Sequence, residues 1–254
     1  MKLSVCIDSV FRGLGLEDSL RKVKAEGFRA FEFWGWEKKD LGLMTKLVEE
    51  LDLSLSAFCV KQANLTEPSA RSAYLDGLKE TLEVAKRLQC RTLILTVGNE
   101  RAGVPREEQR RSLVEGLRAS LSLLEGTGVT LAVEPLNTLI DHPGYFLSYS
   151  QEAWDILQEV RHPQVQMLFD IYHQQITEGH VTTNLLRMLE RVGHIHSAGN
   201  PGRGELGEGE LHYPYIFKRL TEAGYQGYVG LEYFTAEDPV ESLQRMAAEY
   251  SEWL

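Results

Sequence analysis

Four residues with metal-binding side chains occur in the second half of the chain, each within a short apolar run. Glu134 lies in LAVEPL, Asp170 in MLFDIY, His196 in HIHSAG and Glu232 in VGLEYF. Three carboxylates buried near one another must be neutralised by a cation or take up protons, because an unpaired buried charge is strongly unfavourable. Three carboxylates and one imidazole suit one Mn²⁺, Mg²⁺ or Co²⁺ ion better than zinc, whose closed sites favour thiolate and imidazole.

Each of these four residues, taken alone, has an ordinary explanation. A single acidic residue after a strand commonly caps a helix or carries a solvated charge. The metal interpretation therefore depends on whether the fold brings all four side chains together. They are separated by 36, 26 and 36 residues, and each separation is compatible with one strand-and-helix unit.

Short runs rich in β-branched and aliphatic residues predict eight strands along the chain. They cover residues 3–8, 30–35, 53–60, 92–98, 130–137, 165–173, 194–199 and 228–234. Segments with helical periodicity lie between them, most clearly at 70–88 and 106–128. The segment 18–27 ends at Gly27, a typical helix C-terminal residue. Eight strands that alternate with eight helices indicate an α/β fold with a parallel sheet.

A single-domain (β/α)8 TIM barrel over residues 1–254 fits this pattern best. Eight units of about 32 residues give the usual length of such a barrel, about 250 residues. An open, doubly wound sheet is the alternative. It would require a glycine-rich phosphate loop after the first strand, and DSVFRGLGLED has Gly13 and Gly15 but no third glycine at the required spacing.

In a (β/α)8 barrel the active site lies at the C-terminal ends of the strands. Glu134, Asp170, His196 and Glu232 lie near the ends of the fifth to eighth predicted strands, so we expect them to form one site. His194 and His196 are two residues apart and face the same side of their strand, roughly 6–7 Å apart. His196 is level with the strand end and is the expected ligand. His194 is expected to be a hydrogen-bonded interior residue one layer lower.

Composition narrows the classes of partner and location. The net charge is −10 and the pI is about 5.3, so a phosphate backbone would be repelled and nucleic acid is not an expected partner. The three cysteines have no paired spacing, which fits a reducing cytosol. There is neither a signal-peptide pattern nor an apolar run of membrane-spanning length. A cytoplasmic protein without membrane contact is the expectation.

The motifs EPLN, FDIYH, HIHSAGNPGR and GLEYF resemble those of the xylose isomerase-like TIM barrels. Within that superfamily the chain is most similar to hydroxypyruvate isomerases and ketose 3-epimerases, over essentially its whole length. The resemblance implies that the four residues bind one divalent ion and that Glu134 and Glu232 are the catalytic acid/base pair. It also implies that His173 and Arg203 contact substrate oxygens.

This ligand set suits proton transfer on a small keto acid or keto sugar. A metal ion polarises the carbonyl and acidifies the neighbouring C–H, and two carboxylates can move the proton by way of a cis-enediolate. Alternatives remain for the two substrate contacts. His173 would then only orient Asp170, and Arg203 would form a surface ion pair with Glu205 or Glu208.

The chain also departs from its relatives. Hydroxypyruvate isomerases usually have glutamine where this chain has His196, and their loop after the third strand differs from VKQANLTEPSAR. The ketose 3-epimerases carry a second glutamate where this chain has Ile140. In FEFWGW, Trp34 is a candidate for packing on a short sugar or else an ordinary rim aromatic, and the role of Glu32 is open. Lys61 either meets an acidic or hydroxylated substrate or is a solvated loop lysine.

The sequence therefore predicts a metal-dependent isomerase, with several alternatives. A ketose 3-epimerase or an inosose dehydratase-type lyase would use the same ligands. A zinc AP endonuclease of the same superfamily fits poorly, because it needs more histidines at the strand ends and a less acidic surface. A non-catalytic sugar-binding barrel is the alternative that is not an enzyme. A homodimer or homotetramer is compatible with the resemblance.

Overall fold

The computed structural model describes residues 1–61 and 64–254, which form a closed barrel of eight parallel strands. Each strand pairs with its neighbours in chain order, and β1 closes the ring against β8. The strands are β1 (Lys2–Cys6), β2 (Ala30–Phe33), β3 (Ser54–Cys59), β4 (Thr92–Leu95), β5 (Thr130–Val133), β6 (Val165–Asp170), β7 (Val192–Ser197) and β8 (Tyr228–Leu231). The predicted (β/α)8 barrel is confirmed.

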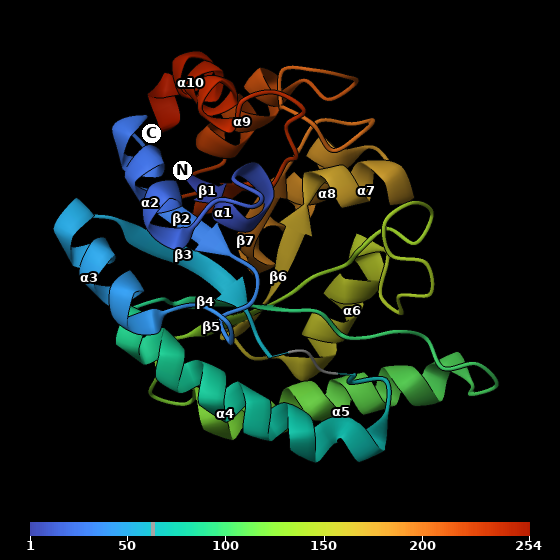
Figure 1. Ribbon diagram of the computed structural model, residues 1–254. Coiled ribbons are helices and arrows are strands. Elements are labelled where there is room, and N and C mark those ends of the chain that lie inside the picture. The colour runs from blue at the N-terminus through green and yellow to red at the C-terminus, as the bar shows by residue number, and fades with distance from the viewer. Residues whose placement is uncertain (62–63) are drawn as a thin grey trace.

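Helices surround this barrel, as Figure 1 shows. They are α1 (Ile7–Val10), α2 (Leu16–Ala25), α3 (Leu41–Leu51), α4 (Arg71–Leu88), α5 (Arg106–Leu124), α6 (Ser150–Val160), α7 (Ile171–Thr177), α8 (Val181–Met188), α9 (Tyr213–Glu222) and α10 (Pro239–Glu249), with short 3-10 helices at 68–70, 189–191 and 251–253. Their apolar faces and the outer face of the strands form one large core. Within the described ranges, no helix is long and apolar enough to cross a bilayer.

The predicted strands extend one to four residues too far at their C-terminal ends. Apolar residues continue beyond the strand ends, where Val97, Leu136 and Ile171 are buried, so the apolar pattern does not mark where pairing stops. The prediction of a strand to residue 173 is wrong, because Asp170 ends β6 and caps α7. The prediction of eight helices is too low, since α1 and α2 both lie between β1 and β2, and α7 and α8 both lie between β6 and β7. In the loop after β3, residues 62–63 lie outside the described part.

The barrel interior is apolar on one side and polar on the other. Small and branched apolar side chains from β3 to β6, namely Ala57, Ile94, Ala132 and Leu168, form one interior cluster. Buried polar side chains fill the other side, from Ser4 on β1, Glu32 on β2, Ser56 on β3 and His194 on β7. Branched apolar residues usually fill such interiors, so this polar side requires an explanation.

Candidate metal centre and active site

The register of the strands brings the four predicted ligands to one end of the barrel. Asp170 on β6 pairs with His196 on β7, and His196 pairs with Gly230 on β8, two residues before Glu232. Glu134 directly follows β5. All four side chains are buried, and each places one potential ligand atom within 4.8 Å of the others.

The spacing around His196 has the room that a shared cation needs. The Nδ1 atom of His196 lies 3.4 Å from an oxygen of Glu134, 3.4 Å from one of Glu232 and 3.9 Å from one of Asp170. These separations exceed ordinary hydrogen bonds, which fall near 2.7–3.2 Å. The described part of the chain supplies no hydrogen-bond partner for this buried nitrogen. Oxygen ligands with one imidazole therefore fit a divalent ion such as Mn²⁺ or Mg²⁺.

Asp170 has two roles, one for each carboxylate oxygen. Its Oδ1 accepts a hydrogen bond of 3.0 Å from the backbone N–H of His173 and so caps α7. Its Oδ2 is directed to the cluster, 3.9 Å from His196. Burial and the nearby Glu232 carboxylate raise the pKa of Asp170. The ionised form is therefore disfavoured by its surroundings unless a cation is present.

Glu232 is the most strongly contacted of the three carboxylates. Trp34 Nε1 donates to its Oε1 at 2.6 Å, and Arg203 donates to its Oε2. Burial alone would raise the pKa of Glu232, but the charges of His196 and Arg203 hold it well below its usual range. Glu232 is therefore ionised at neutral pH.

Arg203 reaches the mouth of the barrel from the loop after β7. Its guanidinium lies over the rings of Tyr172 and Phe234, with centroids at 5.3 and 5.5 Å, and its Nη1 is 4.0 Å from Asp141 Oδ1. Its backbone has a positive φ of 57°, which is unfavourable for a residue other than glycine. The alternative ion pair with Glu205 or Glu208 is not formed; Arg203 pairs with Glu232.

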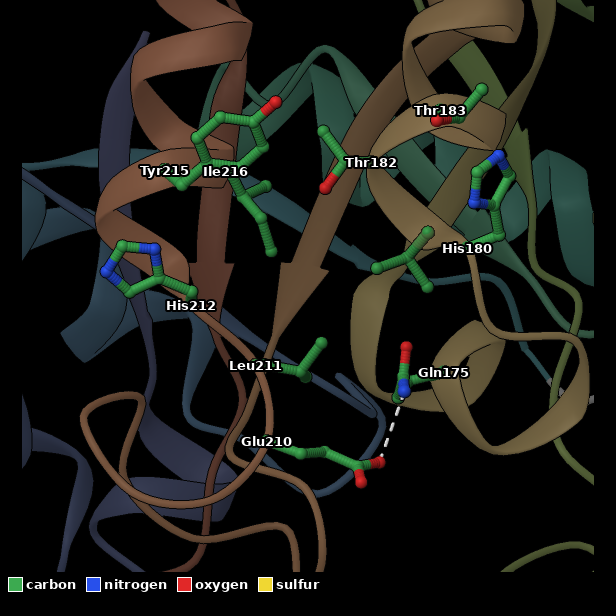
Figure 2. Close-up of a pocket in the computed structure, with 10 residues that line it drawn as sticks. Gln175, His180, Thr182, Thr183, Glu210, Leu211, His212, Tyr215 and Ile216 are labelled. Atoms are coloured by element: carbon green, nitrogen blue, oxygen red, sulfur yellow. Dashed lines mark hydrogen bonds between the residues drawn. The ribbon is translucent and has the colours of Figure 1, made fainter.

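A hydrogen-bond network anchors the far end of the same loop. Glu210 accepts hydrogen bonds from Asn200 Nδ2 at 2.5 Å and from Gln175 Nε2 at 3.1 Å. Figure 2 shows the Gln175–Glu210 bond beside a surface pocket between α7, α8 and the start of α9. This pocket of about 230 Å³ is lined by none of the four candidate ligands. It is a groove beside the loop, apart from the four candidate ligands at the strand ends.

His173 is buried with one ring nitrogen free for a substrate. The Oδ1 atom of Asn137 accepts hydrogen bonds from the backbone N–H groups of Ile140 and Asp141. This orientation leaves Asn137 Nδ2 to donate to His173 Nδ1 at 2.6 Å. Nδ1 is then an acceptor and Nε2 carries the proton. Nε2 lies 3.6 Å from Asp170 Oδ2, and the described residues give it no hydrogen-bond partner.

Burial and the Arg203 charge lower the pKa of His173 to about 3, which keeps the ring neutral. A neutral ring with a free N–H is a suitable donor to a substrate oxygen.

Glu32 is a site residue whose role the sequence left open. Its buried carboxylate contacts His194 Nε2 at 2.8 Å with Oε2 and His196 Nε2 at 3.0 Å with Oε1. The two imidazoles hold the pKa of Glu32 at about 2, although burial opposes this. His194 is thus the interior, hydrogen-bonded histidine that the sequence predicted.

The sequence analysis did not identify Asp141 and Tyr172, and it left the role of Lys61 open. Asp141 accepts a hydrogen bond from Tyr172 at 3.0 Å and lies beside Arg203, so both belong to the rim of the site. The HPGY turn after Asp141 was the available signal. Lys61 forms an exposed ion pair with Glu80 at 2.9 Å, which favours the solvated-lysine interpretation.

The family model described as xylose isomerase-like TIM barrel matches residues 20–254. A human protein that carries the provisional name hydroxypyruvate isomerase is 39% identical over 181 residues, 69% of this chain and 65% of its own length. The matched part therefore spans slightly less than two thirds of that protein. A 2-oxo-tetronate isomerase from Cupriavidus necator is 32% identical over 228 residues, 85% of this chain and 86% of its own.

Solved structures show the same fold. A Brucella melitensis protein described as an AP endonuclease of family 2 superposes with a TM-score of 0.93, at 28% identity, over 98% of this chain and 99% of its own. An L-ribulose 3-epimerase superposes with a TM-score of 0.86 at 18% identity, over 100% and 94% of the two chains, a likeness of fold alone. With the matches in sequence, these findings place the chain in the xylose isomerase-like TIM barrel family.

Proposed function

We propose that this chain is a divalent-metal-dependent isomerase of a small 2-keto acid. The observation that carries the proposal is the convergence of Glu134, Asp170 and Glu232 on the unpartnered Nδ1 of His196. These four residues would hold the ion. When bound, the ion supplies a Lewis acid that polarises the substrate carbonyl and makes the adjacent C–H more acidic.

The two glutamates would move the proton. Glu232, whose pKa the Arg203 charge helps to hold down, takes a proton from the carbon beside the carbonyl. The resulting cis-enediolate is reprotonated on the neighbouring carbon by Glu134, which enters the step as the carboxylic acid, while the hydroxyl proton passes to the former carbonyl oxygen. The carbonyl thereby moves by one carbon and the composition of the substrate stays the same.

Three further residues would contact the substrate. Arg203 supplies a positive charge and His173 a neutral N–H donor, both directed to the cluster, and such donors stabilise negative charge on an enediolate or a carboxylate. The Trp34 ring is partly exposed at the rim and lies edge-on to Phe234 at 6.3 Å. It would both hold Glu232 and cover one face of the substrate.

A keto acid is favoured over a neutral ketose by two observations. The named relatives are assigned to hydroxypyruvate and to 2-oxo-tetronate, which are both short 2-keto acids. Arg203 also offers a guanidinium that can bind a carboxylate in a bidentate manner. The net charge of −10 argues against an abasic nucleic acid as substrate.

A ketose 3-epimerase is the second candidate, since His196 replaces the glutamine usual in hydroxypyruvate isomerases. Ile140, where those epimerases carry a second glutamate, opposes it, because Ile140 is largely exposed and cannot transfer a proton. A dehydratase of inososes would use the same ligands.

One experiment separates these reactions. Protein stripped with EDTA is incubated in D₂O with C3–C6 keto acids, ketoses and inososes, with and without Mn²⁺, and the products are followed by NMR. We expect Mn²⁺-dependent conversion of a short keto acid to an isomer of equal mass, with solvent deuterium beside the carbonyl. Inverted configuration at C3 with the carbonyl in place would indicate the epimerase, and loss of one water the dehydratase.

Equal activity without metal would overturn the metal dependence. Full activity of Glu134→Gln or Glu232→Gln would overturn the assignment of the acid/base pair. Binding of a sugar without turnover would indicate the non-catalytic barrel.

A further inference from the structure

Glu32 joins the two histidines of β7 across the interior of the barrel. Its Oε1 is 3.0 Å from His196 Nε2, and its Oε2 is 2.8 Å from His194 Nε2. The hydroxyl of Ser56 also donates to Oε2, at 3.0 Å. All four side chains are buried, so these contacts are protected from water.

The two nitrogens of His196 face different surroundings. Nδ1 faces three carboxylates at 3.4–3.9 Å, which is too far for strong hydrogen bonds. Nε2 lies closer to a single carboxylate oxygen, 3.0 Å from Glu32 Oε1, although the contact is not aligned as a hydrogen bond. A carboxylate carries no proton of its own, and its oxygen at this distance would be repelled by a lone pair on Nε2, so the contact favours a proton on Nε2.

We propose that Glu32 is a positioning residue that fixes the tautomer of His196 and so presents the Nδ1 lone pair to a divalent ion. This inference rests on the proposed metal-dependent function and goes beyond it by assigning a role to a residue outside the ligand set. Histidine ligands commonly have such a carboxylate partner, which fixes the ring and raises its basicity.

The surroundings of Glu32 are shaped for this contact. Gly230 lies opposite His196 on the neighbouring strand, and a Cβ at position 230 would come within 2.1 Å of Glu32 Oε1. A glycine at this position thus leaves the space that the carboxylate occupies. Oε2 of Glu32 is hydrogen-bonded to His194 and Ser56, and Oε1 lies 3.0 Å from His196 Nε2, which favours a supporting role over direct ligation.

A Glu32→Gln change would reverse the tautomer. The Ser56 hydroxyl and His194 Nε2 both lie beside the Oε2 position, which favours the amide oxygen there. The amide nitrogen then faces His196 Nε2, which must accept a hydrogen bond and lose its proton. The proton of the neutral ring moves to Nδ1, where it occupies the lone pair that the ion requires.

The test measures metal affinity, independently of turnover. Mn²⁺ is titrated by calorimetry into EDTA-stripped wild type, Glu32→Gln, His196→Gln and the double variant, with circular dichroism as the check of folding. We expect Glu32→Gln to weaken Mn²⁺ binding roughly 10- to 100-fold in the wild-type background. In the His196→Gln background the same change should cost less than about threefold, because an amide ligand has no tautomer to lose.

Gly230→Ala is the second variant, since it leaves the Glu32 carboxylate intact and displaces it from His196. It should weaken Mn²⁺ binding roughly tenfold. This variant tests the proposal even if Glu32→Gln does not fold. Nitrogen-15 NMR of the wild type saturated with Mg²⁺ reports the tautomer directly, and we expect a protonated Nε2 and an unprotonated Nδ1 on His196.

The outcomes separate the inference from the function on which it rests. Absence of Mn²⁺ binding by the wild type would overturn the metal-dependent function itself. Wild-type binding that is unchanged in Glu32→Gln and Gly230→Ala would overturn only the role of Glu32. Equal losses from Glu32→Gln in both backgrounds, or a protonated Nδ1 in the Mg²⁺-loaded wild type, would also refute tautomer control.

Discussion

Asp170 offers a test that separates a structural role from a charge role in one side chain. Its Oδ1 caps α7 through the N–H of His173, and its Oδ2 faces the cluster. The Asp170→Asn variant would keep the cap, because asparagine is as good an N-cap as aspartate, whereas Asp170→Ala would lose it. Both substitutions remove the negative charge that the ion needs. The pair therefore distinguishes the two roles.

The expected magnitudes follow from these contacts. In metal-free protein the ionised Asp170 is disfavoured by burial and by Glu232, since both raise its pKa. Asp170→Asn should therefore increase the free energy of unfolding of the metal-free form at neutral pH. The loss of the cap should make Asp170→Ala about 1 kcal/mol less stable than Asp170→Asn, which corresponds to roughly 2–4 °C in Tm for a chain of this size.

Metal reverses the order of wild type and Asp170→Asn. At an ion concentration about 100 times its dissociation constant, wild type gains about 2.7 kcal/mol, or roughly 5–10 °C in Tm. If removal of one ligand weakens binding about 100-fold, Asp170→Asn gains only about 0.4 kcal/mol at the same concentration.

Thermal unfolding of wild type and both variants, in EDTA and in excess Mn²⁺, measures all of these differences. A metal-free Asp170→Asn that is less stable than wild type would refute the argument from buried charge. An equal gain from Mn²⁺ in wild type and Asp170→Asn would remove Asp170 from the ligand set. Equal stability of Asp170→Asn and Asp170→Ala would mean that the cap contributes nothing.

Three other changes test single contacts. Trp34→Phe keeps a ring at the rim but removes the donor to Glu232, and should lower kcat roughly tenfold with little change in KM; an unchanged kcat would contradict the role of the indole N–H. Arg203→Lys keeps the charge but loses the planar group stacked on two aromatic rings. It should raise KM for a keto acid, measured from initial rates at several substrate concentrations. Tyr145→Phe removes the hydroxyl that donates to the backbone carbonyl of Glu134 at 2.9 Å. It should lower the free energy of unfolding by about 1–3 kcal/mol, measured by urea denaturation; a value within error of wild type would show that water replaces the hydroxyl.

The barrel and the convergence of the four candidate ligands were predictable because each depends on local pattern. The alternation of apolar runs and amphipathic segments specifies the fold. Acids within apolar runs stand out, since a carboxylate is rarely buried without a partner. The end of each strand was less predictable, as at Asp170, where a strand passes directly into a helix and the apolar pattern continues.

The partners of the ligands were not predictable in the same way. Glu32 and His194 are 162 residues apart and lie on strands that do not pair with each other. The contact between Asn137 and His173 depends on how a loop after β5 folds over α7. Such contacts depend on side-chain directions across the barrel interior, which residue spacing along one strand does not contain.

The alternation of side chains along each strand explains why the barrel interior is polar beneath the candidate site. Neighbouring inward positions on a strand are two residues apart, so His194 lies one layer below His196, and Gly230 one layer below Glu232. Glu32 fills the lower layer, where it binds His194, and reaches upward to His196. A buried carboxylate in this layer would be costly without partners. The lower layer therefore serves as a support that orients the imidazole above it, which explains why polar side chains replace the branched apolar residues usual at this depth.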